Sequence, residues 1–294
     1  VPIRRLESLR DELERFKREE ELNGFQKWIL DDLYDFKITE DLVARSILLV
    51  AVPHPFYAHV ELAFGGKLYS CLSLVASDIE TTEAKIRTAL PKGRRMALAE
   101  NLPLKRLAVQ SGMAVYGRNN ICYIAGMGSS FSLAAFFTDF PFFFYSWNEF
   151  EVASFCSGFV HSLSRCPTGA IRKERFLIDN ERCLSCLNES GEAFPSWLDP
   201  AVHHTLYDCL RCQVGCPMNR DQELNTVGPI VFSEIETESL MDGRGFDFYS
   251  PELARKAKYL GLDKWPAGIP KNLRALIELR DGDEPRLQGP AALK

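Results

Sequence analysis

The sequence predicts an α+β protein, with an α/β layer in its N-terminal half and a metal-organised segment behind it. Helical and strand patterns alternate up to about residue 150, whereas seven of the nine cysteines lie between residues 156 and 216. Short helical patterns return after the cysteines. We therefore expect three parts: an α/β domain at 1–150, a cysteine-rich domain at 151–220 and a C-terminal helical extension at 221–294.

The first predicted element is an amphipathic helix over residues 3–22. Its apolar residues recur at three- and four-residue steps, so they share one face while charged side chains face water. This face comprises Ile3, Leu6, Leu9, Leu13 and Phe16. The run SILLVAVPHPF at 46–56 then predicts a buried strand that ends in a rigid loop, because two prolines follow the apolar residues.

Two further helices are expected before residue 115. Residues 78–90 follow a cap formed by Ser77 and Asp78 and stop at Pro91. The run PLKRLAVQSG at 103–112 begins with proline and ends with glycine, which is typical of a helix.

The remaining elements are strands followed by short helices. ICYIAG at 121–126 predicts a strand, and residues 131–147 predict a buried strand and loop. The latter stretch is apolar, but it is interrupted and too short to span a membrane. Residues 250–262 and 270–279 have helical patterns, and residues 281–294 are expected to form a frayed tail.

Charge and composition exclude few function classes. A net charge of -5 gives no strong signal for nucleic-acid binding, because domains of that kind usually show a clustered basic face. The first residues are charged and lack the apolar core of a signal peptide. We therefore expect a cytoplasmic protein without a membrane span, in a reducing compartment where clustered thiols are more often metal ligands than disulfides.

The run CSGFVHSLSRCPTGAI at 156–171 is similar to half of a bacterial ferredoxin motif. Such a run carries cysteines ten, seven and four residues before its Cys-Pro dipeptide. Cys156 stands ten residues before Cys166, the cysteine of the Cys-Pro dipeptide, whereas Phe159 and Ser162 occupy the other two positions. Neither phenylalanine nor serine is an ordinary iron ligand.

A second run, CLRCQVGCPMN, carries the same spacing at Cys209, Cys212 and Cys216. In ferredoxins, three thiolates of a four-iron cluster come from one run, and the Cys-Pro cysteine of the other run supplies the fourth. Two Cys-Pro dipeptides in this arrangement predict an iron–sulfur protein.

A zinc ribbon is the alternative, because two C-x2-C pairs are present. The first pair is Cys183 and Cys186, and the second is Cys209 and Cys212. Two histidines, His203 and His204, could join such a metal site, although loop or surface positions are the ordinary reading for them. A ribbon has no need for the Cys-Pro dipeptides, which favours iron.

Longer motifs carry a family resemblance. The run LAVQSGMAVYGRNNICYIAGMGSSFSLAAFFTDFP at 107–141 is followed by CPTGAI, IDNERCLSC and DCLRCQVGCPMN. In this order, across roughly residues 40–220, they resemble the epoxyqueuosine reductase family and its double-cluster relatives, which include the core of corrinoid reductive dehalogenases. The resemblance implies a nitroreductase-like α/β domain of the cobalamin-binding type, followed by a ferredoxin-like iron–sulfur domain.

The resemblance also implies which cysteines bind iron. One [4Fe–4S] cluster would be held by Cys166, Cys183, Cys209 and Cys212. The other cluster would need Cys156, Cys216 and the positions now occupied by Phe159 and Ser162, so we expect it to be lost. A minority alternative is a second cluster rebuilt on Cys156, Cys186 and Cys216 with a histidine or water. Two further cysteines, Cys71 and Cys122, are expected in the core.

A cobalamin site is implied at two glycine-containing segments. The turn of Tyr116, Gly117, Arg118, Asn119 and Asn120 corresponds to a family turn, and the loop with Gly126, Gly128 and Ser129 follows it. Glycines there permit close backbone approach to a large ligand, and they also suit ordinary turns. The nearest candidate for the family's acidic proton donor is Glu100, with His54 and Tyr57 as alternatives.

The resemblance thus implies an oxidoreductase that passes electrons from a [4Fe–4S] cluster to a cobalamin and then to an unknown substrate. Its partners would be a low-potential electron-donor protein and a small-molecule or nucleoside-like substrate. The alternative from another class is an electron-transfer or scaffold iron–sulfur protein without a corrinoid.

Overall fold

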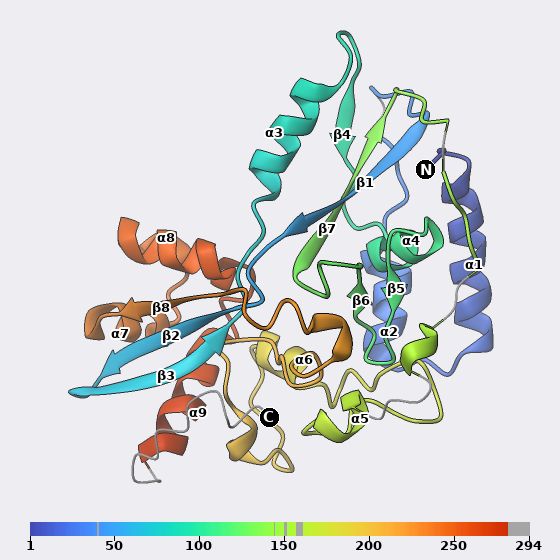
Figure 1. Cartoon of the computed structure of the whole chain (residues 1–294). Helices are drawn as coiled ribbons and strands as arrows, with labels where there is room; N and C mark the ends of the chain where they lie inside the picture. Colours follow the sequence, from blue (N-terminus) through green and yellow to red (C-terminus); the bar gives the residue numbers. More distant parts are fainter. Residues whose placement is uncertain (40, 144, 150–151, 157–160, 282–294) are drawn as a thin grey trace. The chain divides into compact units, whose positions relative to one another are not determined.

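The computed structural model describes residues 1–281 except residues 40, 144, 150–151 and 157–160 (Figure 1). Contacts divide the chain into two compact units. Unit 1 comprises Val1–Pro53 and Ser77–Gly158, and unit 2 comprises His54–Ala76 and Phe159–Lys294. The mixed α+β class is confirmed, but the division differs from the three predicted parts. Residues 54–76 lie with the C-terminal half because a strand formed there pairs with one far along the chain.

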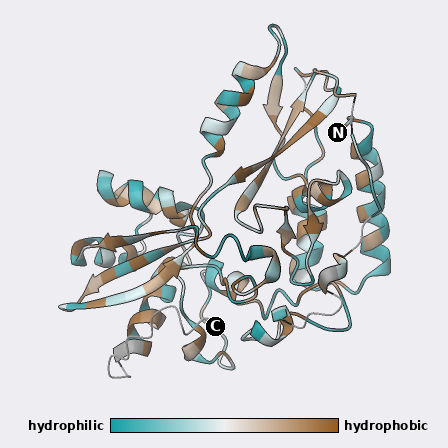
Figure 2. Ribbon diagram, viewed as in Figure 1, coloured by the Kyte–Doolittle hydropathy of each residue, from teal (hydrophilic) through white to brown (hydrophobic). Residues whose placement is uncertain are grey.

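The main sheet of unit 1 has three antiparallel strands in the order β1-β7-β4. Their bounds are β1 (Ser46–Pro53), β7 (Phe131–Thr138) and β4 (Met96–Leu98). The predicted strands at 46–56 and within 131–147 are therefore confirmed. In Figure 2, much of β1 has the hydrophobic colour, which agrees with its buried alternate residues Ile47, Leu49 and Val52.

Helices of unit 1 begin where the caps and the apolar periodicity indicate. They are α1 (Arg5–Glu19), α2 (Gly24–Trp28), the π-helical turn η1 (Ile29–Leu33), α3 (Ile79–Ala89), α4 (Leu104–Gln110) and the 3-10 turn η2 (Ser154–Cys156). Helix α1 buries Leu6, Leu9 and Leu13, as predicted. The Asp78 side chain caps α3 by accepting a hydrogen bond from the backbone N–H of Thr81 at 2.9 Å.

A small hairpin completes unit 1. It joins β5 (Val115–Tyr116) to β6 (Cys122–Tyr123), which is shorter than the strand predicted at 121–126. Tyr116 also forms a parallel bridge with Val152. The segment that leads to Cys156 is therefore attached to the edge of this hairpin.

Unit 2 contains a second sheet, in the order β3-β2-β8. Its strands are β2 (Tyr57–Phe64), β3 (Lys67–Ser73) and β8 (Thr226–Phe232). Strands β2 and β3 are antiparallel, whereas β2 and β8 are parallel. None of these strands was predicted, although Ala58, Val60 and Leu62 are buried at alternate positions and carry the period of two that marks a half-buried strand.

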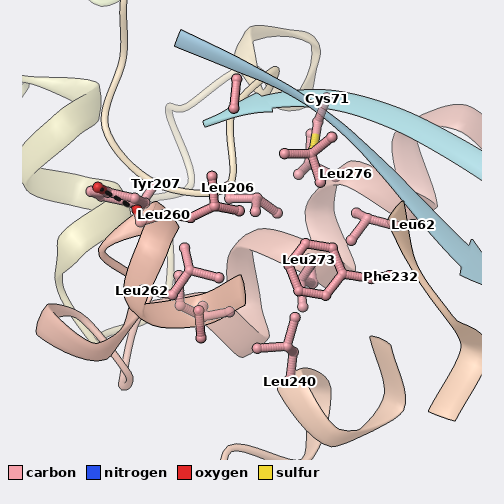
Figure 3. Close-up of a cluster of buried hydrophobic side chains, with 14 of the residues drawn as sticks. Leu62, Cys71, Leu206, Tyr207, Phe232, Leu240, Leu260, Leu262, Leu273 and Leu276 are labelled. Atoms are coloured by element: carbon pink, nitrogen blue, oxygen red, sulfur yellow. Dashed lines mark hydrogen bonds between the residues drawn. The ribbon is translucent and has the colours of Figure 1, made fainter. Parts of the chain in front are cut away.

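Helices α7 (Glu234–Asp242), α8 (Pro251–Leu260) and α9 (Ile269–Asp281) share an apolar core with this sheet (Figure 3). The other helical segments of unit 2 are α5 (His161–Arg165), α6 (Leu184–Glu189) and the 3-10 turns η3 (Pro200–Val202), η4 (Pro217–Asn219), η5 (Phe246–Phe248) and η6 (Leu262–Lys264). Cys71 and Phe232 from the sheet meet Leu240 and Leu273 from the helices in this core. The core role predicted for Cys71 and the helices predicted at 250–262 and 270–279 are confirmed, whereas α7 was not predicted.

Within the residues that the structure describes, no helix has both the length and the apolar character that a membrane crossing requires.

Candidate functional site

Cys166, the first predicted cluster ligand, follows helix α5 and is partly exposed. Its sulfur lies 3.7 Å from the hydroxyl oxygen of Thr168. The Arg182 Nε–H donates to the carbonyl oxygen of Thr168 at 2.9 Å. Because Arg182 directly precedes Cys183, this bond ties together the segments that carry two of the four predicted ligands.

Cys183 occupies the N-cap position of α6 and is partly exposed. A hydrogen bond from the Cys186 thiol lowers the pKa of Cys183, and the same contact raises the pKa of Cys186. The backbone N–H groups of Cys186 and Ser185 also lower the pKa of Cys183. Such donors stabilise negative charge on sulfur, which is what a thiolate ligand requires.

Cys209 lies in an apolar cluster with Leu184 of α6 and is only 9% exposed. Burial raises the pKa of its thiol to about 12, although a hydrogen bond from the backbone N–H of Arg211 opposes that shift. The charge of Cys183 is close enough to raise this pKa further. The side chain of Asn188 links the two segments, because its Nδ2 donates to the carbonyl oxygen of Asp208 at 2.8 Å.

Cys212 lies in the loop that ends at Cys216 and is partly exposed. This loop is tied to the start of α5, because the His161 Nε2–H donates to the carbonyl oxygen of Val214 at 2.7 Å. The next residue, Gly215, has a φ of +78°, and an added Cβ would lie 2.8 Å from Cε1 of His161. Sequence reasoning missed His161, whose ring packs closely against the loop.

All four predicted ligands therefore lie in unit 2, on segments joined by hydrogen bonds and apolar contacts. Among the described residues, no three His, Cys, Asp or Glu side chains are grouped closely enough to hold a metal ion. A four-iron cluster binds each thiolate at a different corner, so that finding concerns a site for a single ion. The thiols and their backbone N–H donors fit cluster chemistry, and the ligand set stays a prediction.

The thiols that remain are distributed over both units. Cys156 lies in unit 1, whereas Cys186 and Cys216 lie in unit 2. Cys216 is buried, as expected of a small apolar residue, while Cys156 is partly exposed and accepts a hydrogen bond from the backbone N–H of Arg118 at 3.4 Å. Phe159, which stands at a missing ligand position, lies outside the described residues.

The predicted cofactor turn joins β5 to β6, and about half of its residues are buried in unit 1. Tyr116 and Asn119 are buried, and Asn119 Nδ2 donates to the hydroxyl of Tyr123 at 2.9 Å. An added Cβ on Gly117 would lie 2.6 Å from Asn119 Oδ1 and 2.7 Å from Cε2 of Tyr123. Internal packing therefore explains this glycine without any ligand.

The rest of the turn is partly exposed, at Arg118 and Asn120. Asn120 has a φ of 62°, and its carbonyl oxygen accepts a hydrogen bond from Lys105 Nζ at 3.2 Å. Helix α4 therefore braces the turn from behind. Cys122, which follows the turn, is buried as predicted, and burial raises the pKa of its thiol to about 12.

The second predicted cofactor segment offers more open surface. Gly126 is exposed, has a φ of +77° and has no atom within 4 Å of an added Cβ. Gly128 is buried and Ser129 is partly exposed. Ser130 is only 2% exposed, and its hydroxyl has no hydrogen-bond partner among the described residues. An orphaned buried hydroxyl fits a loop that holds a polar ligand, and sequence reasoning did not single it out.

The proton-donor candidates are divided between the two units. Glu100 is exposed in the turn before α4 and belongs to unit 1, whereas His54 and Tyr57 belong to unit 2. The His54 Nδ1–H donates to the carbonyl oxygen of Pro55 at 2.7 Å. Burial, followed by the charge of Glu223, raises the pKa of Tyr57.

Of the two histidines of the zinc alternative, His203 is buried and His204 is partly exposed. His203 is 4% exposed, and its ring lies 4.4 Å from that of Phe194, centroid to centroid. Burial, followed by the charge of Lys271, lowers the pKa of His203 to about 4. The His204 Nδ1–H donates to the carbonyl oxygen of Val202 at 2.8 Å. His203 was expected at the surface or in a loop, and the surface position is wrong.

Curated relatives of the chain are epoxyqueuosine reductases. The protein of Escherichia coli strain K12 is 33% identical over 121 residues, which cover 41% of this chain and 31% of that protein. The Pseudomonas aeruginosa protein is 32% identical over 127 residues, covering 42% and 34% of the two chains. The Bacillus subtilis strain 168 protein is 25% identical over 154 residues, covering 52% and 37%. The chain therefore matches only about a third of the length of these relatives.

Solved structures show that the fold is shared over most of the chain. An epoxyqueuosine reductase with an epoxyqueuosine-modified tRNA-Tyr stem loop has a TM-score of 0.56 at 18% identity, covering 92% of this chain and 74% of that one. The Streptococcus thermophilus enzyme has a TM-score of 0.56 at 15% identity, covering 91% and 74%. No family model matches the chain. The predicted resemblance to epoxyqueuosine reductases is confirmed.

Proposed function

We propose that this chain, a relative of the epoxyqueuosine reductases, is an iron–sulfur oxidoreductase that carries one [4Fe–4S] cluster on Cys166, Cys183, Cys209 and Cys212. The observation that carries the proposal is the linkage of these cysteines in one unit. Bonds from Arg182, Asn188 and His161 join the segments on which they lie. Four thiolates can bind one cluster only if the segments that carry them are held together.

A [4Fe–4S] cluster supplies single electrons at low potential, and a cobalamin supplies a cobalt centre for reductive chemistry. The backbone N–H groups of Ser185 and Cys186 lower the pKa of Cys183, and that of Arg211 lowers the pKa of Cys209. These donors stabilise the negative charge that reduction adds, so they favour the reduced form and raise the potential. This is the electrostatic contribution of the chain to electron transfer.

A cobalamin is the weaker half of the proposal. In unit 1 its site would comprise the partly exposed Arg118, Asn120 and Ser129 and the exposed Gly126, with the buried hydroxyl of Ser130 next to Ser129 in the chain. Arg118 and Ser129 offer hydrogen-bond donors to amide or phosphate groups of a large ligand. The open side of Gly126 permits close backbone approach.

The substrate and the electron donor are proposed only by class. A solved relative binds an epoxyqueuosine-modified tRNA stem loop, so a nucleoside or a nucleoside-like molecule is the first substrate class to test. The net charge of -5 gives no strong signal for binding to long nucleic acid. A low-potential protein donor would supply the electrons.

Metal and corrinoid analysis of the anaerobically purified chain tests both halves. We expect about four irons and four sulfides per chain, because one four-thiolate set is intact. About eight irons would contradict the single cluster, and zinc in place of iron would contradict the cluster altogether.

A second candidate function, electron transfer without a corrinoid, is favoured by one observation. Gly117 and Asn119, which the resemblance places at a cofactor turn, are explained by packing against Tyr123 alone. Titration of the purified chain with cobalamin separates the candidates. A spectral change and a rise in Tm support the reductase, and their absence supports the electron carrier.

A further inference from the structure

Cys186 is not among the four proposed ligands of the cluster. It is the third residue of α6, and Cys183 is the N-cap of the same helix. The two thiols are hydrogen-bonded to each other, and both are partly exposed. Asn180 Nδ2 also donates to the Cys186 sulfur at 3.6 Å, which holds that side chain toward Cys183.

The helix start brings these sulfurs together without strain. Cys183 at the N-cap and Cys186 at the third helical residue are three positions apart, so their side chains lie on the same side of the helix start. A C-x2-C pair at a helix start also has the spacing of dithiol redox motifs, so a disulfide can form with little backbone movement.

We propose that Cys186 protects the cluster ligand Cys183 by forming a reversible disulfide with it whenever the cluster is absent. The inference rests on the proposed function only in taking Cys183 as a ligand. With the cluster bound, Cys183 is engaged by iron and the pair cannot close. In the iron-free chain, the same contact gives an oxidised Cys183 an immediate thiol partner.

The chemistry balances with a hydroperoxide as the oxidant. One sulfur of the pair attacks hydrogen peroxide and becomes a sulfenic acid, and one water leaves. The other thiol then attacks that sulfur, a Sγ–Sγ bond forms and a second water leaves. Two protein thiols have lost two electrons, which have reduced one peroxide to two waters. A dithiol reductant restores both thiols by exchange.

Peptide mapping of the full-length chain tests the disulfide directly. The chain is freed of iron with a chelator, treated with hydrogen peroxide and alkylated. Trypsin cuts after Arg182 and a glutamate-specific protease cuts after Glu189, so the fragment 183–189 carries both cysteines and no other. We expect this fragment to lack both alkyl groups after peroxide and to regain them after dithiothreitol. A disulfide that joins either cysteine to another part of the chain would overturn the proposal.

Two matched variants test the protective role. After peroxide and then dithiothreitol, the wild-type chain and Cys216→Ser should rebind iron, whereas Cys186→Ser should rebind about threefold less, because Cys183 proceeds to the irreversible sulfinic acid. Equal recovery in Cys186→Ser would overturn the inference. Circular dichroism checks that the variants fold. If Cys186→Ser does not fold, peptide mapping of the wild-type chain alone tests the proposal.

The same experiment separates failure of this inference from failure of the proposed function. A chain that binds iron but never forms the Cys183–Cys186 disulfide overturns the inference and leaves the cluster intact. A chain that forms the disulfide but never binds iron overturns the proposed cluster and with it the protective role.

Discussion

The backbone N–H of Arg118 donates a hydrogen bond to Sγ of Cys156 across 3.4 Å. Arg118 lies in the turn between β5 and β6, and Cys156 ends the helical turn η2. The N–H of Ala153 donates to the carbonyl oxygen of Tyr116 at 2.8 Å, which brings the two segments together. A thiol that belongs by spacing to the incomplete ligand set therefore contacts the backbone of the predicted cofactor turn.

Replacement of Cys156 tests whether this bond has taken over from iron. We expect Cys156→Ala to weaken cobalamin binding about two- to tenfold, since a net hydrogen bond contributes about 0.5–1.5 kcal/mol. Iron content should stay unchanged. The measurements are a spectral titration and an iron assay, with Cys216→Ala as the control that should leave affinity unchanged. A loss of about four irons in Cys156→Ala would instead identify Cys156 as a ligand of a second cluster.

Two cysteines of the same loop provide a test of the ligand set. Cys212→Ala should lose about four irons per chain, because it removes one thiolate of the proposed cluster. Cys216→Ala should keep them, because the predicted set does not use this buried thiol. Iron and sulfide assays on anaerobically purified protein read the difference. If both variants lose iron equally, the assignment of one complete and one broken ligand set is wrong.

The close approach of His161 to Gly215 predicts a sharp substitution effect. Gly215→Ala places a side chain at a φ of +78° and a Cβ 2.8 Å from the His161 ring. The strain in the left-handed region alone costs about 1 kcal/mol, and the ring must also shift. We expect a lower free energy of unfolding and poorer iron retention, both measured against the exposed Gly126→Ala.

A cycle with His161→Ala isolates the contact. If the clash causes the loss, Gly215→Ala should be milder in the His161→Ala background, and the residual effect should be that of the backbone conformation. Equal effects in both backgrounds would show that the ring contact contributes nothing.

His203 should make the unfolding free energy depend on pH. Burial, followed by the charge of Lys271, lowers its pKa from 6.5 to about 4, so the folded chain favours the neutral ring. The stabilisation is present above the unfolded value and is lost as pH falls through the folded pKa. His203→Gln should therefore reduce the decline between pH 6.5 and 4 by roughly 2 kcal/mol.

Urea unfolding at several pH values, on samples of equal iron content, measures this decline. The control is His59→Gln, because the His59 ring is only partly buried on strand β2. A decline that is the same in the wild type and in His203→Gln would contradict the prediction.

Elements with short-range signals were predictable from the sequence. The cap at Asp78, the apolar period of α1 and the proline and glycine that bound α4 act within a few residues. The cysteine motif was also recognisable from the sequence, because the spacing of its residues reflects how one short run surrounds a cluster. Strand β8 was missed because its partner, β2, is distant in sequence. The hairpin of β2 and β3 was missed although its signal, a period of two on either side of Gly65 and Gly66, is local.

By itself, the sequence determined the α+β class and five of the α-helices, since these depend on local periodicity, whereas the four cysteines of the proposed cluster follow from the family resemblance. The tertiary structure alone decided that residues 54–76 join the C-terminal unit and that Gly117 packs against Tyr123. It also decided that Cys156 accepts the N–H of Arg118 and that Cys186 contacts Cys183. The physical reason is that strand pairing, close packing and thiol hydrogen bonds depend on where the folded backbone brings each group, which residue spacing does not encode.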